Sequence, residues 1–352
     1  MTRQLRYFEA VREAHAQLLA GDPRNCVLGL GVPGPTGVFG TTRGLQEEFG
    51  EGRVFDMPSS ENAMTGIALG LALMGRRPII VHMRVDFAVL SMEPLVNQAA
   101  KWHYMYGGKL KAPLTVRMIV GRGWGQGPQH SQSLQAWFAH VPGLKVVMPT
   151  TPHDAKGMLI AASRDDAPVI ILEHRWLYNV AGPVPETPYE VPLGRAAILR
   201  KGRDVTLAAT SYMTLESLKA ADLLAQIGVD AEVVDLRSVA PIDTATLCES
   251  VGRTGRLVVS DTGHEFFGVG AEVIAAVTEN SFGVLKSAPL RIGLPHIPTP
   301  TTPALADLYY PLARDIAAAA LKGLGSTREL PPDDSDPRKW KDVPDPSFKG
   351  PY

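Results

Sequence analysis

The chain has 352 residues, enough for about two domains of ordinary size. Lys and Arg total 35 and Asp and Glu total 36, and this balance argues against a nucleic-acid-binding or membrane-surface protein. The two cysteines, Cys26 and Cys248, exclude a disulfide scaffold and a cysteine-based metal site. No apolar run reaches about 18 residues, and Glu9 and Glu13 lie where a leader peptide would avoid acids. We therefore expect a cytoplasmic protein without a membrane span.

The first half of the chain alternates short apolar runs with helical patterns. After an amphipathic N-terminal helix, the runs are nearly unbroken and rich in β-branched residues, which is typical of strands buried on both faces of a parallel sheet. We predict strands over residues 26–30, 54–57, 77–83, 114–120, 145–148 and 169–173, and helices over 61–74, 90–104, 131–140 and 153–163. Strands that alternate with helices indicate right-handed βαβ units and an open, doubly wound sheet.

A proline-rich segment over residues 179–192 interrupts this alternation. We place a linker at 181–192, between a first α/β domain over 1–180 and a second over 193–325. The second domain has predicted strands over 204–209, 231–239, 256–261 and 290–292, and helices over 215–227, 244–251, 270–277 and 312–324. The predicted fold class is α/β, with two doubly wound domains.

The last residues, 326–352, are expected to form an extended, proline-rich C-terminal arm. They contain six prolines in 27 residues and no periodic pattern, so they cannot build a core of their own. They also contain Trp340, Phe348 and Tyr352, which are unusual in a purely solvated tail. Two interpretations remain open, a mobile end or an arm that docks its aromatic side chains on a partner chain.

Two segments are candidates for a functional site, whereas P-loop, H-E-x-x-H and G-x-S-x-G motifs are missing from the sequence. Glu61 starts a helix after the predicted strand 54–57. It either complements the helix dipole or faces a ligand at the carboxyl ends of the strands. His130 follows a loop with four glycines in seven residues. It is a candidate acid/base group, although a lone histidine is more often structural.

Longer stretches carry a family likeness in their order and spacing. They are residues 37–45, 53–58 with Glu61, 66–75, Pro-Gln-His-Ser-Gln at 128–132, 141–147, Asp-Ala-Lys-Gly at 154–157 and Phe-Gly-Val-Gly-Ala-Glu at 267–272. Over residues 1 to about 325, the chain resembles the beta subunit of the thiamine-diphosphate-dependent decarboxylating component of 2-oxoacid dehydrogenase complexes, of the pyruvate, branched-chain and acetoin type. The resemblance implies a pyrimidine-binding α/β domain followed by a transketolase C-terminal domain.

The resemblance also implies roles for individual residues. Glu61 matches a glutamate that hydrogen-bonds the cofactor's pyrimidine N1′ and favours the imino tautomer, which takes the proton from thiazolium C2. Phe87 matches an aromatic residue that stacks on the pyrimidine, and His130 matches a histidine that handles protons during reductive acylation. Backbone carbonyls around four further residues match a potassium site, namely those of Ala162, Ser163, Asp165 and Ala167.

A partner chain is implied as well. The family holds Mg²⁺ and the diphosphate with a Gly-Asp-Gly…Asn motif, and no Gly-Asp-Gly occurs in this sequence. An alpha subunit that carries the motif should therefore hold the Mg²⁺ and complete the thiamine diphosphate site in an α2β2 heterotetramer. The resemblance also implies a lipoyl acyltransferase core as a further partner. We expect no nucleic-acid or membrane partner.

The sequence departs from the family pattern near the expected site. Leu30 and Gly31 replace two acids of the family, one of which joins a chain of carboxylates between the active sites, and Arg84 and Asp86 bring charges beside the stacking position. We favour a decarboxylating 2-oxoacid dehydrogenase beta subunit. One alternative is a split transketolase-like or acyloin-forming carboligase subunit. Another is a non-catalytic paralogue that acts as a scaffold, although the presence of all three matched site residues argues against it.

Overall fold

The computed structural model describes residues 2–122 and 125–333, which form two compact units. The first unit contains residues 2–120 and 137–193, and the second contains 121–136 and 194–333. The segment 121–136 therefore leaves the first unit and belongs to the second, which the sequence did not predict. Within the described ranges, no helix combines the length and the apolar character that crossing a bilayer requires.

A parallel sheet forms the core of the first unit. Its strands from this unit follow the order β6-β7-β5-β4-β2-β3, with β2 between β3 and β4, so the chain winds outward in both directions. β5 and β7 are buried along their whole length, as predicted for strands covered on both faces. The bounds are β2 (Asn25–Leu28), β3 (Val54–Phe55), β4 (Arg77–His82), β5 (Thr115–Val120), β6 (Lys145–Val147) and β7 (Val169–His174).

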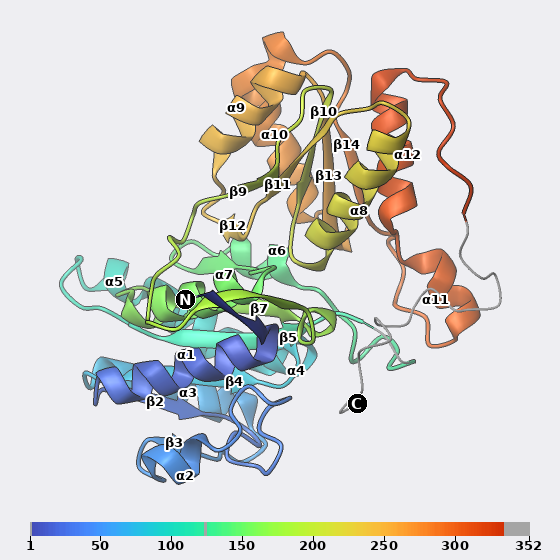
Figure 1. Ribbon diagram of the computed structural model, residues 1–352. Helices are drawn as coiled ribbons and strands as arrows, with labels where there is room; N and C mark the ends of the chain where they lie inside the picture. Colours follow the sequence, from blue (N-terminus) through green and yellow to red (C-terminus); the bar gives the residue numbers. More distant parts are fainter. Residues whose placement is uncertain (1, 123–124, 334–352) are drawn as a thin grey trace. The chain divides into compact units, whose positions relative to one another are not determined.

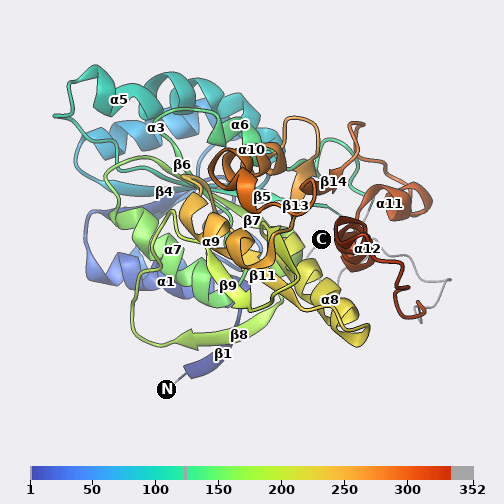
Figure 2. The same cartoon turned by 90° about the horizontal axis from the view of Figure 1, so that it is seen from above.

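Helices cover both faces of this sheet. Figure 2 shows α1 (Tyr7–Gly21) and α7 (Pro152–Arg164) on one side, and α3 (Glu61–Leu73) and α5 (Ala100–Met105) on the other. The helix predicted over 90–104 is instead a 3-10 turn (Val89–Ser91), a π-helix (Glu93–Ala99) and α5. Pro94 lies at the start of the π-helix, where it cannot donate a backbone hydrogen bond. The short helices are α2 (Leu45–Phe49), α4 (Val85–Ala88), α6 (Gln135–Ala139) and a 3-10 turn (Arg175–Leu177).

Two short strands of the first unit were not predicted. β1 (Thr2–Arg6) pairs antiparallel with β8 (Ala181–Pro185), so the N-terminal helix begins only at Tyr7. Lys156 on α7 is fully buried and places its Nζ 2.6 Å from Glu13 Oε1 on α1. The same Nζ donates to the carbonyl of Pro185, at 2.7 Å. These contacts of Lys156 join α1, α7 and β8.

The second unit has its own mostly parallel sheet, in the order β14-β13-β10-β11-β9. Only β9 runs antiparallel to its neighbour, β11. α8 packs against α12 on one face, and α9 packs against α10 on the other (Figure 1). The strands are β9 (Ala197–Arg200), β10 (Val205–Ala209), β11 (Ala231–Asp235), β12 (Ser238–Ala240), β13 (Leu257–His264) and β14 (Leu290–Leu294). The helices are α8 (Tyr212–Gln226), α9 (Thr244–Thr254), α10 (Val269–Ser281), α11 (Pro303–Tyr309), α12 (Ala313–Leu324) and a 3-10 turn (Phe282–Val284).

The beginning of the C-terminal arm lies along the second unit of its own chain. Leu330 packs against the core that α8 and α12 share. Arg314 Nη2 donates to the carbonyl of Pro331 at 2.9 Å, and Arg328 Nη1 donates to that of Gly228 at 2.9 Å. The aromatic residues that suggested a docking arm, Trp340, Phe348 and Tyr352, lie outside the described residues.

Candidate functional site

Two of the predicted site residues lie at the same edge of the first sheet. β2, β3 and β4 are parallel neighbours, so their carboxyl ends meet at one edge. Glu61 follows β3 as the first residue of α3, and Phe87 follows β4 within α4. Because α3 and α4 contact each other, the fold brings Glu61 and Phe87 to one part of this edge.

The start of α3 is fixed to the end of β4 by a buried polar contact. Thr65 Oγ1 lies 3.2 Å from Nε2 of His82, the last residue of β4. Burial of the His82 ring lowers its pKa to about 4, so the ring is neutral near pH 7. This contact holds the helix that carries Glu61 against the strand that leads to Phe87.

The Glu61 carboxylate is placed to accept a hydrogen bond from a ligand. It is partly exposed in the first turn of α3, where the helix dipole stabilises a negative charge. In the part of the chain that the structure describes, no residue forms a hydrogen bond or ion pair with it. The Phe87 ring is 37% exposed. A carboxylate and a partly exposed aromatic residue therefore both lie at this edge.

The loop after β2 accounts for one of the departures from the family pattern. Gly31 has a φ of 72°, a left-handed conformation that disfavours any side chain. Its N–H donates to Asp56 Oδ1 at 2.8 Å, and the N–H of Met57 donates to the same oxygen at 2.9 Å. An acid at position 31 would be strained in this turn, and a carboxylate from Asp56 already lies beside it.

Two buried arginines add positive charge to the carboxyl edge. Arg84 precedes α4 and is 4% exposed, and Arg175 follows β7 and is 2% exposed. Burial lowers the pKa of Arg84, against the opposing effect of Asp86. Burial lowers the pKa of Arg175 to about 10, and its guanidinium lies 4.5 Å above the Phe39 ring. Arg84, which the sequence marked as unusual, is thus part of a buried charged group next to α4.

A buried ion pair joins two strands of the first sheet, β5 and β7. Arg117 on β5 and Glu173 on β7 are both buried and form two hydrogen bonds, Nε to Oε1 at 2.5 Å and Nη2 to Oε2 at 2.7 Å. The Tyr178 hydroxyl donates to Glu173 Oε2 at 2.7 Å. His15 Nε2 lies 3.4 Å from Arg117 Nη1, and burial together with this cation keeps the pKa of His15 well below its usual value. This cluster fixes the spacing of two central strands.

His130 belongs to the second unit. Its segment is held there because Gln135 Nε2 donates to Oδ1 of the buried Asp261 at 2.8 Å, and Arg122 lies 4.2 Å above the Tyr310 ring. Burial raises the pKa of Asp261, although hydrogen bonds partly oppose it. His130 itself is partly exposed. The structure therefore places Glu61 and Phe87 in one unit and His130 in the other.

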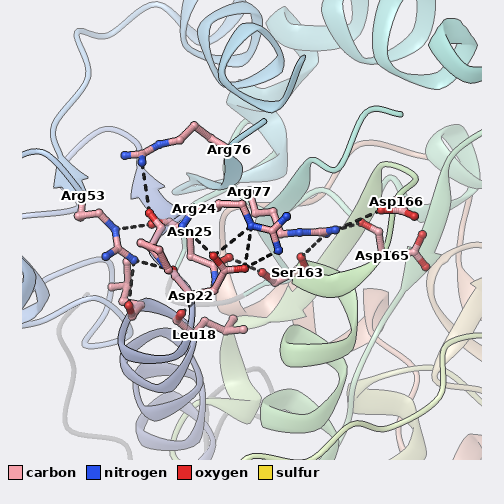
Figure 3. A network of polar contacts seen from close by, with 12 residues as sticks. Leu18, Asp22, Arg24, Asn25, Arg53, Arg76, Arg77, Ser163, Asp165 and Asp166 are labelled. Carbon is pink, nitrogen blue, oxygen red and sulfur yellow. Dashed lines mark hydrogen bonds and ion pairs between the residues drawn. The ribbon is translucent and has the colours of Figure 1, made fainter. Parts of the chain in front are cut away.

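The carbonyls expected to bind potassium lie at the opposite, amino edge of the first sheet. Arg77 Nη1 donates to the carbonyls of Ser163 and Asp165, at 2.9 and 3.0 Å, and its Nη2 donates to Asp166 Oδ1 at 3.1 Å (Figure 3). A guanidinium thus supplies positive charge to two of the four expected carbonyls. Over residues 2–122 and 125–333, no cluster of three or more His, Cys, Asp or Glu side chains is placed to hold a metal ion.

Comparison with known domain families defines the class of this protein. Residues 3–180 match the transketolase pyrimidine binding domain, and residues 194–316 match the transketolase C-terminal domain. The protein therefore combines these two α/β domains in one chain, which confirms the fold class predicted from the sequence.

Individual relatives narrow this class. The chain is 43% identical over 332 residues to the beta subunit of acetoin:2,6-dichlorophenolindophenol oxidoreductase of Cupriavidus necator, covering 92% of this chain and 98% of the relative. It is 40% identical to the pyruvate dehydrogenase E1 component subunit beta of Rickettsia felis, covering 91% and 98%. A solved structure described as a split gene transketolase, inactive beta4 tetramer, matches with a TM-score of 0.75 and 26% identity, covering 92% and 99%. The chain belongs to the family of acetoin and pyruvate dehydrogenase beta subunits, as the sequence predicted.

Proposed function

We propose that this chain, joined to an alpha subunit, forms the thiamine diphosphate site of a 2-oxoacid dehydrogenase and is catalytically incomplete alone. One observation carries the proposal. The Glu61 carboxylate is partly exposed and receives no hydrogen bond from any described residue, at the sheet edge that also carries Phe87. Membership of the family is the reason to assign both residues to this cofactor.

Both residues fit the pyrimidine half of the cofactor. The first turn of α3 favours a charged carboxylate at Glu61, which can accept a hydrogen bond from a ring nitrogen. Phe87 offers a ring face for stacking. The contact between Thr65 and His82 holds α3 against β4, so both groups can reach the same ring. When bound, thiamine diphosphate stabilises the carbanion that decarboxylation of a 2-oxoacid leaves.

We assign His130 to proton transfer in the later step, in which the acyl group moves to an acceptor. An imidazole can donate and accept a proton, and His130 is partly exposed after a glycine-rich loop. Its role concerns a different step from that of Glu61. The two residues should therefore be separable by assays that report on different half-reactions.

The alpha subunit supplies what this chain does not. The sequence contains no Gly-Asp-Gly triplet, so we assign Mg²⁺ and the diphosphate to a Gly-Asp-Gly…Asn motif of the partner. The relatives are named as beta subunits, which supports a partner of the alpha type. We further propose an α2β2 assembly with a lipoyl acyltransferase core as the acceptor.

Potassium stays a prediction for the carbonyls of Ala162, Ser163, Asp165 and Ala167. A potassium ion there would share the Ser163 and Asp165 oxygens with the Arg77 guanidinium, which repels it. We assign no step of the reaction to this ion.

A second candidate donor is a vicinal hydroxyketone. The acetoin oxidoreductase beta subunits of Cupriavidus necator and Bacillus subtilis are 43% and 39% identical to this chain. The same pair of residues, Glu61 and Phe87, would serve cleavage of acetoin, since the cofactor's role is the same for both donors.

Coexpression with an alpha subunit that carries the Gly-Asp-Gly…Asn motif tests the proposal. The purified complex should reduce an artificial oxidant in the presence of thiamine diphosphate, Mg²⁺ and one donor among pyruvate, branched-chain 2-oxoacids and acetoin. Each chain alone should be inactive with every donor. Activity without thiamine diphosphate, or inactivity of the complex with the whole panel, would contradict the proposed function.

A further inference from the structure

A cavity of about 400 Å³ lies at the amino edge of the first sheet, opposite the edge that carries Glu61. Its volume is in the range of small-ligand sites. Five cationic side chains and one carboxylate, that of Asp166, line it together with apolar side chains. The cations come from the segments before β2, β4 and β5 and from the first residue of β4, and they are Arg24, Arg76, Arg77, Lys109 and Lys111.

Three of these cations have partners that explain them. Arg24 Nη2 pairs with Asp22 Oδ2 at 2.7 Å, and Lys111 Nζ pairs with Asp166 Oδ2 at 2.5 Å. Arg77 binds the carbonyls at the C-terminal end of α7 and the same Asp166, as Figure 3 shows. The negative end of a helix dipole favours a cation at such a position.

The other two cations, Arg76 and Lys109, are not paired with a carboxylate of any described residue. Arg76 donates to the carbonyls of Pro23 at 3.2 Å and Gly52 at 3.5 Å and interacts with the Cys26 thiol, but it pairs with no carboxylate among the described residues. It lies close enough to Arg53 that their repulsion adds to burial in lowering the pKa of Arg53. Lys109 is exposed, and in the described part of the chain its ammonium forms no hydrogen bond or ion pair.

An aromatic and apolar wall adjoins these cations. Trp102, Leu73, Leu110 and Pro113 line the same cavity. The Trp102 ring is partly buried and packs against the Tyr106 ring, with centroids 4.7 Å apart, which fixes its position. The cavity thus combines surplus positive charge with a flat apolar surface.

We propose that this cavity binds a nucleoside di- or triphosphate. Its phosphates would contact Arg76 and Lys109, for which no described residue provides a carboxylate partner, and its base would lie against Trp102 and the neighbouring apolar side chains. Inorganic phosphate alone would leave the apolar wall uncovered. This inference does not depend on the proposed catalytic function, because the cavity and the Glu61 edge lie at opposite ends of the strands.

Isothermal titration of the full-length chain tests the inference. ATP, tripolyphosphate and adenosine are compared at low salt and without Mg²⁺, and the ATP titration is repeated with excess thiamine diphosphate as a competitor. We expect ATP to bind, tripolyphosphate to bind more weakly and adenosine to bind below detection. Arg76→Gln and Lys109→Gln should each weaken ATP binding roughly tenfold. Trp102→Leu should weaken ATP binding but not tripolyphosphate binding.

Two controls keep the result interpretable. Arg203→Gln removes one charge from an arginine whose side chain is 87% exposed in the second unit, and it should leave ATP binding unchanged. Arg76→Lys keeps the charge and should retain most of the affinity, which separates loss of charge from misfolding. Absence of ATP binding, equal weakening by Arg203→Gln, or displacement of ATP by thiamine diphosphate would overturn the proposal. Tripolyphosphate binding as tight as ATP binding would overturn the assignment to a nucleoside.

Discussion

The two edges of the first sheet use charge in opposite ways. At the carboxyl edge the cations Arg84 and Arg175 are buried, and the accessible groups are a carboxylate and an aromatic ring, from Glu61 and Phe87. At the amino edge the cations line an open cavity and outnumber the carboxylates there by five to one. The two edges therefore differ in how deeply their cations are buried as well as in which charged residues they contain.

This difference suggests two kinds of binding. A buried charge must be paired in a fixed geometry, because an unsatisfied one costs too much free energy. The carboxyl edge is therefore suited to one rigid ligand in one orientation. The exposed cations of the cavity, Arg24, Lys109 and Lys111, keep more of their hydration than a buried charge does, so the amino edge is suited to a flexible, highly charged ligand.

The largest expected effect concerns the carboxyl edge. In the complex with an alpha subunit, Glu61→Gln should lower the turnover number roughly 10²–10⁴-fold, because a neutral amide cannot stabilise a proton on the cofactor ring. The fold should persist, since Gln has the same shape in the first helical turn. Steady-state kinetics measure the loss, and circular dichroism checks the fold. Near-normal turnover by Glu61→Gln would remove the assignment of this edge to thiamine diphosphate.

The interior between the two edges should be sensitive to loss of charge balance. Glu173→Ala leaves Arg117 buried and uncompensated, so the free energy of unfolding should fall by about 3–5 kcal/mol. Urea unfolding followed by fluorescence measures it. Glu249→Ala removes the partner of an exposed pair in which the Glu249 side chain is 75% exposed, and it should change stability by less than about 1 kcal/mol. A similar small effect for both variants would show that the buried pair does not hold the strands.

The His82 contact gives the carboxyl edge a pH dependence. The pKa of His82 is about 4 in the folded chain, against about 6.5 when unfolded, so the unfolded chain binds more protons between these values. Stability should therefore fall as the pH drops from 6.5 towards 4, by up to about 3 kcal/mol from this residue. His82→Gln should flatten this part of the profile measured by urea unfolding. The exposed His140→Gln serves as the control, and an unchanged slope in His82→Gln would contradict the assignment.

The smallest expected effect on activity distinguishes the role of His130 in the second unit from that of Glu61 in the first. His130→Ala in the complex should reduce transfer to a lipoyl acceptor about tenfold more than it reduces decarboxylation coupled to an artificial oxidant. The reason is that the artificial oxidant bypasses the step assigned to His130. Parallel assays of one preparation give the ratio. Equal losses in both assays would instead assign His130 to donor binding or to placement of the cofactor.

The parallel strands could be predicted from the sequence, but the antiparallel strands β1, β8 and β9 could not. β5 and β7 are unbroken β-branched runs, and burial on both faces leaves little choice of structure. β8 contains two prolines and β9 has only four residues, so their pairing depends on the neighbouring strand rather than on their own pattern. The membership of residues 121–136 in the second unit likewise rests on a distant contact, between Gln135 and Asp261.

The two edges of the first sheet also differ in how far the sequence predicts them. Glu61 and Phe87 could be found because each follows a recognisable strand and matches a family motif. The excess of charge at the amino edge could not be predicted, since Arg24, Arg76 and Lys109 are far apart in the sequence and form no motif. The parallel pairing of β2 with β4 and of β4 with β5 brings the segments before these strands together. The position of the Asp56 carboxylate beside Gly31 could not be predicted either, because these residues are distant in the sequence and meet only in the fold.

Binding of thiamine diphosphate to the separate and combined chains tests most directly that the carboxyl edge is half of a site. Calorimetry would compare this chain, the alpha subunit and their complex, each with Mg²⁺. We expect micromolar or tighter binding only for the complex, and we expect Glu61→Gln to weaken it there. Tight, Mg²⁺-dependent binding by this chain alone would contradict the division of the site between two subunits.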